Sequence, residues 1–228
     1  QDYTQLETYE AYSDMQKGMV FVQDLYRHIV KEVYVKSTFD INGHAVDFDA
    51  EWGTIDFVEA IEKEFGLNAI TCTEAEALNA ARGARVLAAA DDNKARAIDS
   101  LWKMLRKKIA GPAFLVGVPV YLEPLAKRAE NPDTVERFQI IIAGSEVGKG
   151  FSELNDPQDQ RARFEEQQAM RDKGDDEAQR LDEDYVHAME YGMPPAFGFG
   201  VSERLFSFLE NRSAHETQIF PLLRPKSE

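Results

Sequence analysis

Cysteine is almost absent from this sequence, because Cys72 is the only one among 228 residues. One thiol cannot form an internal disulfide, so we expect a reducing, cytoplasmic compartment. Runs of 18 apolar residues are also absent, which predicts that the chain does not cross a membrane. Residues 1–4 are polar and include no initiator methionine. They do not form a signal peptide, and we expect that the chain was cut from a longer protein.

Positive charge is scarce. The chain has 26 basic and 41 acidic residues, which gives a net charge of −15. Such a surface repels phosphate backbones, so a general nucleic-acid binder is excluded unless a local basic patch or another domain supplies the contact. A hydrophobic content of 43% is enough for a folded core. A domain of this size buries roughly 70% of the surface of its unfolded chain.

The spacing of apolar residues predicts both helices and strands. Asn42 and Gly43 separate two strand-like runs and predict a hairpin, because both central residues of the tight turn need positive φ. Thr73 and Glu76 form a capping box that opens a helix. Helices are expected over 15–33, 54–65, from 73, and over 91–109, 156–173, 175–191 and 202–209, and strands over 5–12, 37–41, 44–48, 113–118, 135–143 and 217–222. Strands joined by turns, with helices of unequal length, predict an α+β fold.

Three apparent motifs do not meet their chemical requirements. Residues 144–150 have three rather than four residues between the glycines and Gly150 after the lysine, so a Walker phosphate loop is excluded. Ser202 lacks the glycine two positions later that a nucleophile elbow requires. The acidic run around Asp182 and His187 needs partner motifs on other helices to form a di-metal site, and the sequence has none. We interpret this run as a solvated acidic face.

Two glycine-rich segments are better candidates for a binding site. Residues 146–157 follow an apolar strand, and glycine allows a backbone to approach a ligand closely. Alternate residues of a strand share one face, so Lys149, Phe151 and Glu153 are predicted to point the same way. The alternative is the glycine-rich end of a strand without a ligand.

The second segment, residues 198–204, is a glycine-rich strand that is predicted to run into a helix. Arg204 would then lie in the first turn of that helix. A cation is unfavourable at the positive end of a helix dipole, but it becomes useful when an anion binds there. An ordinary surface arginine is the alternative.

Together these segments resemble the class II lysyl-tRNA synthetases. The run Phe-Ser-Glu-Leu-Asn-Asp-Pro over 151–157 is specific, because the aspartyl and asparaginyl enzymes share the fold but not these residues. The resemblance covers most of the chain. It is carried by residues 1–12 (second strand of motif 2), 123–128, 150–160, 182–185, 191–195 and 198–204 (motif 3).

The resemblance implies a class II catalytic fold, which is an antiparallel β-sheet flanked by helices. Residues 1–228 are then an N-terminally truncated catalytic domain that runs from the end of motif 2 through motif 3. Motif 1, which forms the family's homodimer, the anticodon-binding domain and the motif 2 arginine are absent. We therefore expect these 228 residues to be inactive by themselves.

The family chemistry that the resemblance implies has two steps and uses Mg²⁺. Lysine attacks the α-phosphate of ATP to form lysyl-adenylate, and the lysyl group then moves to the terminal ribose of tRNA(Lys). The protein positions the reactants and stabilises phosphate charge. The full-length parent is then an ATP-dependent ligase of protein biosynthesis.

The resemblance also assigns a role to each candidate residue. An ammonium in a buried pocket is costly unless it is paired, so a carboxylate in the lysine site makes physical sense. By resemblance, Tyr3 stacks on adenine, Arg204 grips the γ-phosphate, Glu146 holds Mg²⁺, and the lysine site consists of Glu7, Tyr9, Lys149, Phe151 and Glu153, with Tyr9 and Glu153 on the ε-ammonium.

Two residues depart from the family pattern. Gln139 stands where the family usually has a second metal-binding glutamate, and a neutral amide weakens cation binding. Lys149 stands where the family has an asparagine that contacts the substrate carboxylate. Its ammonium either extends to solvent or pairs with that carboxylate, in which case it must lie away from Glu153. Motif 3 is also one residue shorter than usual.

Two other functions remain open from the sequence. One is the related lysyltransferase that modifies a translation factor, and the segments over 123–128 and 151–157 argue against it. The other is a non-catalytic binding module descended from the synthetase. The departures at Gln139 and Lys149 favour such a module, whereas the retained Glu146, Glu153 and Arg204 argue against it.

Overall fold

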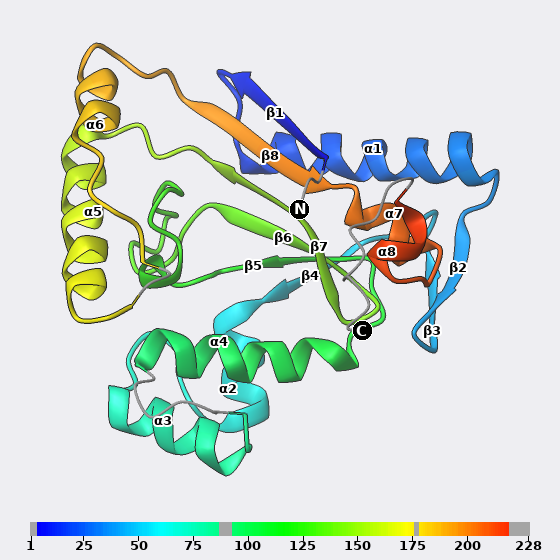
Figure 1. Cartoon of the computed structure of the whole chain (residues 1–228), viewed down its shortest axis with the longest axis horizontal. Helices are drawn as coiled ribbons and strands as arrows, with labels where there is room; N and C mark the ends of the chain where they lie inside the picture. Colours follow the sequence, from blue (N-terminus) through cyan, green and yellow to red (C-terminus); the bar gives the residue numbers. More distant parts are fainter. Residues whose placement is uncertain (1–3, 87–92, 176–177, 219–228) are drawn as a thin grey trace, which may run out of the picture.

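The computed structural model describes residues 4–86, 93–175 and 178–218, and a six-stranded sheet forms its centre (Figure 1). The strands, in their spatial order, are β1 (Gln5–Ala11), β8 (Ala196–Ser202), β7 (Ser145–Ser152), β6 (Arg137–Ile142), β5 (Ala113–Val116) and β4 (Gly53–Asp56). All neighbouring strands are antiparallel except β4 and β5, which are parallel. The predicted α+β class, an antiparallel sheet flanked by helices, is confirmed, with this one parallel pair in addition.

Helices cover both faces of the sheet, because its strands alternate between two apolar clusters. Phe114 and Ile140 belong to one cluster, whereas their neighbours Leu115 and Ile141 belong to the other. The helices are α1 (Met15–Tyr34), α2 (Phe57–Phe65), α3 (Glu74–Gly83), α4 (Lys94–Leu105), α5 (Pro157–Asp172), α6 (Glu183–Glu190), α7 (Arg204–Leu209) and α8 (Ala214–Thr217), with 3-10 turns η1 (Arg106–Lys108) and η2 (Val120–Leu122) and hairpin strands β2 (Thr38–Ile41) and β3 (His44–Asp47). Helix α1 and the β2–β3 hairpin complete the first cluster, and helices α2, α3 and α4 complete the second (Figure 1).

Local sequence signals set several of these elements. Asn42 and Gly43 have φ angles of 51° and 78° in the hairpin turn, as predicted. Thr73 and Glu76 form both hydrogen bonds of the capping box at the start of α3. These elements depend on neighbouring residues alone, and the sequence therefore predicted them.

The helix predicted over 54–65 was wrong in its first part. Residues Gly53–Asp56 form β4, because the β-branched Thr54 and Ile55 pair with the buried strand β5. The side chain of Asp56 then accepts a hydrogen bond from the backbone of Glu59 and caps α2. Pairing with a strand that is distant in the sequence therefore decided the structure of this segment.

The elements predicted over 175–191 and 217–222 also differ from the structure. The helix predicted over 175–191 is confined to α6 among the described residues, because the backbone N–H groups of Gln179 and Leu181 donate to glutamine side chains of α5 instead. Thr217 ends α8 and does not begin the strand predicted over 217–222. Residues 219–222 of that prediction lie outside the described ranges.

Candidate functional site

A cavity of about 1000 Å³ opens between strands β1, β8, β7 and β6 and helix α4. Lys149, Phe151 and Glu153 all line it, which confirms that they share one face of their strand. The other candidates that line the same cavity are Glu7, Tyr9, Gln139, Glu146 and Arg204. Tyr3 lies outside the described residues.

Two cross-strand rows form the floor of this cavity. In the first row, Gly198 on β8 lies between Tyr9 on β1 and Phe151 on β7. The second row consists of Glu7, Gly200, Lys149 and Gln139. Because a glycine occupies the β8 position of both rows, neighbouring side chains lie directly over this strand: a Cβ at Gly198 would meet Glu153 and Tyr9, and a Cβ at Gly200 would meet Gln5.

Glu153 lies just beyond β7, and its backbone N–H donates to the carbonyl of Ala196 at 2.8 Å. The residue is only 8% exposed, and its Oε1 atom has no hydrogen-bond partner. Gly198 passes so close that a Cβ there would collide with this oxygen. Burial, and next the charge of Glu7, raise the pKa of Glu153 to about 7, whereas Lys149 lowers it. The site therefore contains a buried carboxyl group whose charge is poorly compensated.

Tyr9 stands beside this carboxyl group and is fixed by Glu7. The phenol donates to Glu7 Oε2 at 2.9 Å, and the amide of Gln5 donates to Glu7 Oε1 at 2.6 Å. The hydrogen bond to Glu7, together with burial, raises the pKa of Tyr9 to about 12. Tyr9 is therefore neutral at physiological pH, and its oxygen can still accept a hydrogen bond.

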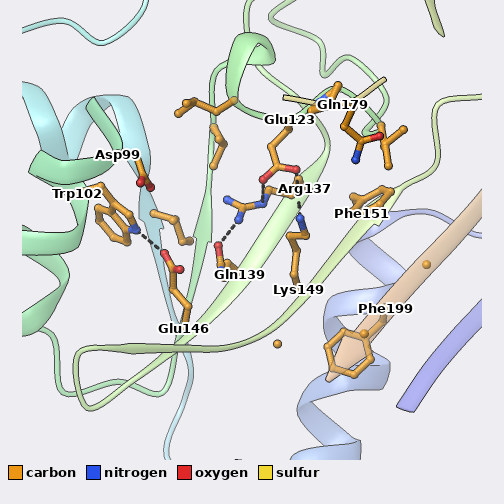
Figure 2. Close-up of a pocket in the computed structure, with 18 of the residues that line it drawn as sticks. Asp99, Trp102, Glu123, Arg137, Gln139, Glu146, Lys149, Phe151, Gln179 and Phe199 are labelled. Atoms are coloured by element: carbon orange, nitrogen blue, oxygen red, sulfur yellow. Dashed lines mark hydrogen bonds and ion pairs between the residues drawn. The ribbon is translucent and has the colours of Figure 1, made fainter. Parts of the chain in front are cut away.

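Glu123, Arg137 and Lys149 form an ion-paired cluster in the same cavity (Figure 2). Arg137 Nε lies 3.1 Å from Glu123 Oε1, and Lys149 Nζ lies 3.4 Å from Glu123 Oε2. Arg137 also donates to the amide oxygen of Gln139. Lys149 therefore neither extends freely to solvent nor stands alone, because Glu123 already holds its ammonium.

Glu146, near the start of β7, is held from α4 and the turn that follows. Trp102 Nε1 donates to Glu146 Oε1 at 2.8 Å (Figure 2). Arg106 Nε lies 3.8 Å from the same atom. The carboxylate is partly exposed and lines the cavity. Within the described ranges, no group of three or more His, Cys, Asp or Glu side chains is placed to hold a metal ion. Any ion at Glu146 would need further oxygen ligands from water or from a bound phosphate.

Arg204 begins α7 and lies in its first turn, as predicted. Its side chain is exposed and lines the cavity. The helix predicted over 202–209 begins two residues later, because Ser202 still pairs with Gln5 in the sheet. The structure therefore brings Arg204 to the same cavity as the lysine-site candidates.

Comparison with known proteins decides the family. The model of the family described as tRNA synthetases class II (D, K and N) matches residues 1–224. The chain belongs to this family. Curated relatives include proteins named lysine–tRNA ligase from Roseiflexus sp. (strain RS-1), 38% identical over 232 residues, Chloroflexus aurantiacus, 38% over 234, and Fervidobacterium nodosum, 35% over 230. The alignments cover 99%, 100% and 100% of this chain but 47%, 47% and 45% of the relatives. The chain spans about half the length of the curated relatives it matches.

The resemblance to class II lysyl-tRNA synthetases and the class II catalytic fold are thereby confirmed. The sequence did not point to Trp102 or Arg137, and it marked Glu123 only as the first residue of a family-like segment. No local pattern joins these side chains to Glu146 or Lys149, because the pairs form across strands and helices. The acidic run behaves as interpreted, since Asp182 caps α6 and His187 is exposed.

Proposed function

We propose that the full-length protein is a lysine–tRNA ligase. It joins lysine to ATP to form lysyl-adenylate and pyrophosphate, and it then transfers the lysyl group to tRNA(Lys). The family of the chain and the names of its curated relatives favour this function over a translation-factor lysyltransferase or a non-catalytic module. The observation that carries the proposal is the buried carboxyl group of Glu153, which has an oxygen without a hydrogen-bond partner.

Glu153 and Tyr9 are proposed to bind the ε-ammonium of lysine. A buried carboxylate is costly unless it is paired, and the substrate ammonium supplies both the opposite charge and the missing hydrogen bond. Tyr9 already donates its proton to Glu7, so its oxygen is oriented to accept from the ammonium. Phe151 provides an apolar wall for the methylene chain. An uncharged isostere of lysine would leave Glu153 unpaired, and the site therefore rejects it.

Lys149 is proposed to bind the α-carboxylate at the other end of the substrate. Its side chain is 44% exposed, and its ammonium lies beside Glu123. Glu123 is shared with Arg137, so two cations compensate one anion in this cluster. The cluster therefore retains a positive charge that can receive a carboxylate.

Arg204 and Glu146 are proposed to serve ATP. Arg204 offers a charge-assisted hydrogen bond to the γ-phosphate. Mg²⁺ usually binds proteins through one or two carboxylates together with substrate phosphates, and the carboxylate of Glu146 fits that pattern. The Gln139 amide oxygen accepts from Arg137 and adds no negative charge, so it does not fit as a second ligand. A Mg²⁺ ion at Glu146 would neutralise phosphate charge.

Further proposals concern the full-length protein. Residues 1–228 would supply the part of its catalytic domain from the end of motif 2 through motif 3. The protein would act as a homodimer in the cytoplasm, and its basic RNA contacts would lie outside this acidic chain of net charge −15. Among the residues that the structure describes, no helix combines the length and apolarity needed to cross a bilayer.

Lysine-dependent exchange of pyrophosphate into ATP tests the proposed function. We expect the full-length protein to catalyse this exchange and Glu153→Gln to reduce it at least about thirtyfold, because loss of a buried charge partner costs about 2–5 kcal/mol. Glu166→Gln is the matched control, since Glu166 is an exposed residue of α5. Exchange that is absent in the wild type, or equal in Glu153→Gln and the control, would contradict the proposal.

A further inference from the structure

Lys149 carries the same functional group as the proposed substrate. It lies on the same strand face as Glu153, with Phe151 between them, and four residues of strand correspond to about 13 Å between Cα atoms. Its Nζ atom lies 5.9 Å from the centre of the Phe151 ring. The charge of Lys149 also acts on Glu153, whose pKa it lowers. The protein thus holds an ammonium of its own near a carboxylate that is proposed to bind one.

Glu123 keeps this ammonium in place. Its side chain is fixed by Arg137 Nε at 3.1 Å, and its backbone is fastened by Arg163, whose guanidinium donates to the carbonyls of Glu123 at 3.4 Å and Ala126 at 2.6 Å. Lys149 Nζ lies 3.4 Å from this anchored carboxylate. An ammonium in a partly buried site stays with its nearest anion, because unpaired charge is costly there.

We propose that Glu123 is a positioning residue that holds the Lys149 ammonium away from Glu153 and so keeps Glu153 free for the ammonium of an external lysine. The inference rests on the lysine site proposed above. Without the charge of Glu123, Lys149 becomes an internal competitor for Glu153. A group tethered by a short flexible arm acts at an effective concentration on the order of millimolar. External lysine must then compete with it.

The competition can be measured by a double-mutant cycle. Lysine Kd values are determined by calorimetry for the full-length protein and for Glu123→Gln, Lys149→Met and the double variant. We expect Glu123→Gln to raise the Kd about tenfold when Lys149 is present and less than twofold when it is methionine. The amide keeps a hydrogen-bond acceptor opposite Arg137, so the fold should be retained.

Asp159→Asn is the matched control. Asp159 pairs with Arg163 and Arg128 in the same region, and neither of these ion pairs involves Lys149. We expect its lysine Kd to stay within twofold of the wild type. A rise like that of Glu123→Gln would mean that general loosening of this segment weakens binding, and it would overturn the inference. Should the amide variant unfold, Glu123→Asp moves the carboxylate away from Lys149 on a shorter arm, and we expect a smaller rise of the lysine Kd that is likewise lost when Lys149 is methionine.

The remaining outcomes separate the inference from the proposed function. An equal effect of Glu123→Gln in both backgrounds, or no effect in either, overturns the positioning role of Glu123 while the lysine site stands. Tight lysine binding by Glu153→Gln would overturn the lysine site and this inference with it.

Discussion

Glu123 and Glu153 share one cavity and are nearly equally buried, at 9% and 8% exposure, yet their surroundings are opposite. Glu123 is paired with both Arg137 and Lys149. Glu153 has an oxygen without a hydrogen-bond partner, and its pKa is raised to about 7. Buried polar groups are normally satisfied, so the exception needs an explanation. Burial alone therefore does not distinguish the two carboxyl groups, whereas the oxygen without a partner does.

The sheet explains why the surroundings of Glu123 and Glu153 differ. On the side of Glu123, strands β6 and β7 supply the cations Arg137 and Lys149. On the side of Glu153, strand β8 supplies Gly198, which has no side chain, and the carboxyl group of Glu153 and the ring of Tyr9 occupy the space over it. One pocket along strand β7 therefore has a compensated end, where Arg137 and Lys149 pair with Glu123, and an uncompensated end at Glu153.

The largest expected effect is a difference in the free energy of unfolding between variants of Glu123 and Glu153. Glu123→Leu should lower the free energy of unfolding by about 3–5 kcal/mol, because it leaves Arg137 buried without its counter-charge. Glu153→Leu should be neutral or stabilising, because it removes a buried charge that has no partner. Urea denaturation of both variants near pH 8 measures this contrast. Equal destabilisation by the two changes would break the comparison.

The next largest effect distinguishes the residues proposed to bind lysine from Arg204, which is proposed to bind the γ-phosphate of ATP. Arg204→Ala in the full-length protein should weaken ATP use by about 1.5–3 kcal/mol, or roughly ten- to a hundredfold, because a charge-assisted phosphate contact is lost. The concentration of lysine needed for half-maximal pyrophosphate exchange should stay nearly constant. An unchanged ATP dependence would count against the role of Arg204.

Lys149→Met tests whether the compensated end binds the α-carboxylate of lysine. It should weaken lysine binding by about 1–3 kcal/mol, because the substrate carboxylate loses its charged partner. Cadaverine, which is decarboxylated lysine, should lose far less affinity. Calorimetry with both ligands checks this, and equal losses, or none for either, would refute the carboxylate role of Lys149.

The smallest effect is a dependence on pH that only the uncompensated end produces. Because the pKa of Glu153 is about 7, its carboxyl group is protonated in the free protein below that value. Lysine affinity should fall about tenfold per pH unit below 7 and level off above it. The raised pKa also means that the contribution of Glu153 to folding stability is present below about pH 4.5 and is lost as the pH rises through 7. Lysine titrations from about pH 5.5 to about pH 8.5 test this, and a profile identical in Glu153→Gln would contradict it.

The features that the sequence predicted depend on local periodicity. The shared face of Lys149, Phe151 and Glu153 follows from strand alternation, and the place of Arg204 in a first helical turn follows from the glycine-rich strand before it. By contrast, Lys149 and Glu123 are 26 residues apart and meet only through the folded sheet. Local rules contain no such pairing, so the sequence left only two options for Lys149, and the structure shows a third.

The register between the strands could not be predicted from the sequence either. Gly198 lies between Tyr9 and Phe151 because of strand pairings that join distant parts of the chain. A shift of one residue would turn these side chains to the opposite face. The residue types in the proposed lysine site were therefore readable from the family resemblance, but their arrangement around the glycines of β8 required the structure.

The central claim is that Glu153 receives the ammonium of lysine. The most direct measurement is calorimetric binding of lysine and of norleucine, which lacks the ammonium, to the wild type and to Glu153→Gln near pH 8. We expect the wild type to prefer lysine by about a hundredfold or more, and the variant to bind both ligands with similar, weak affinity. A preference for lysine that survives in Glu153→Gln would contradict the account.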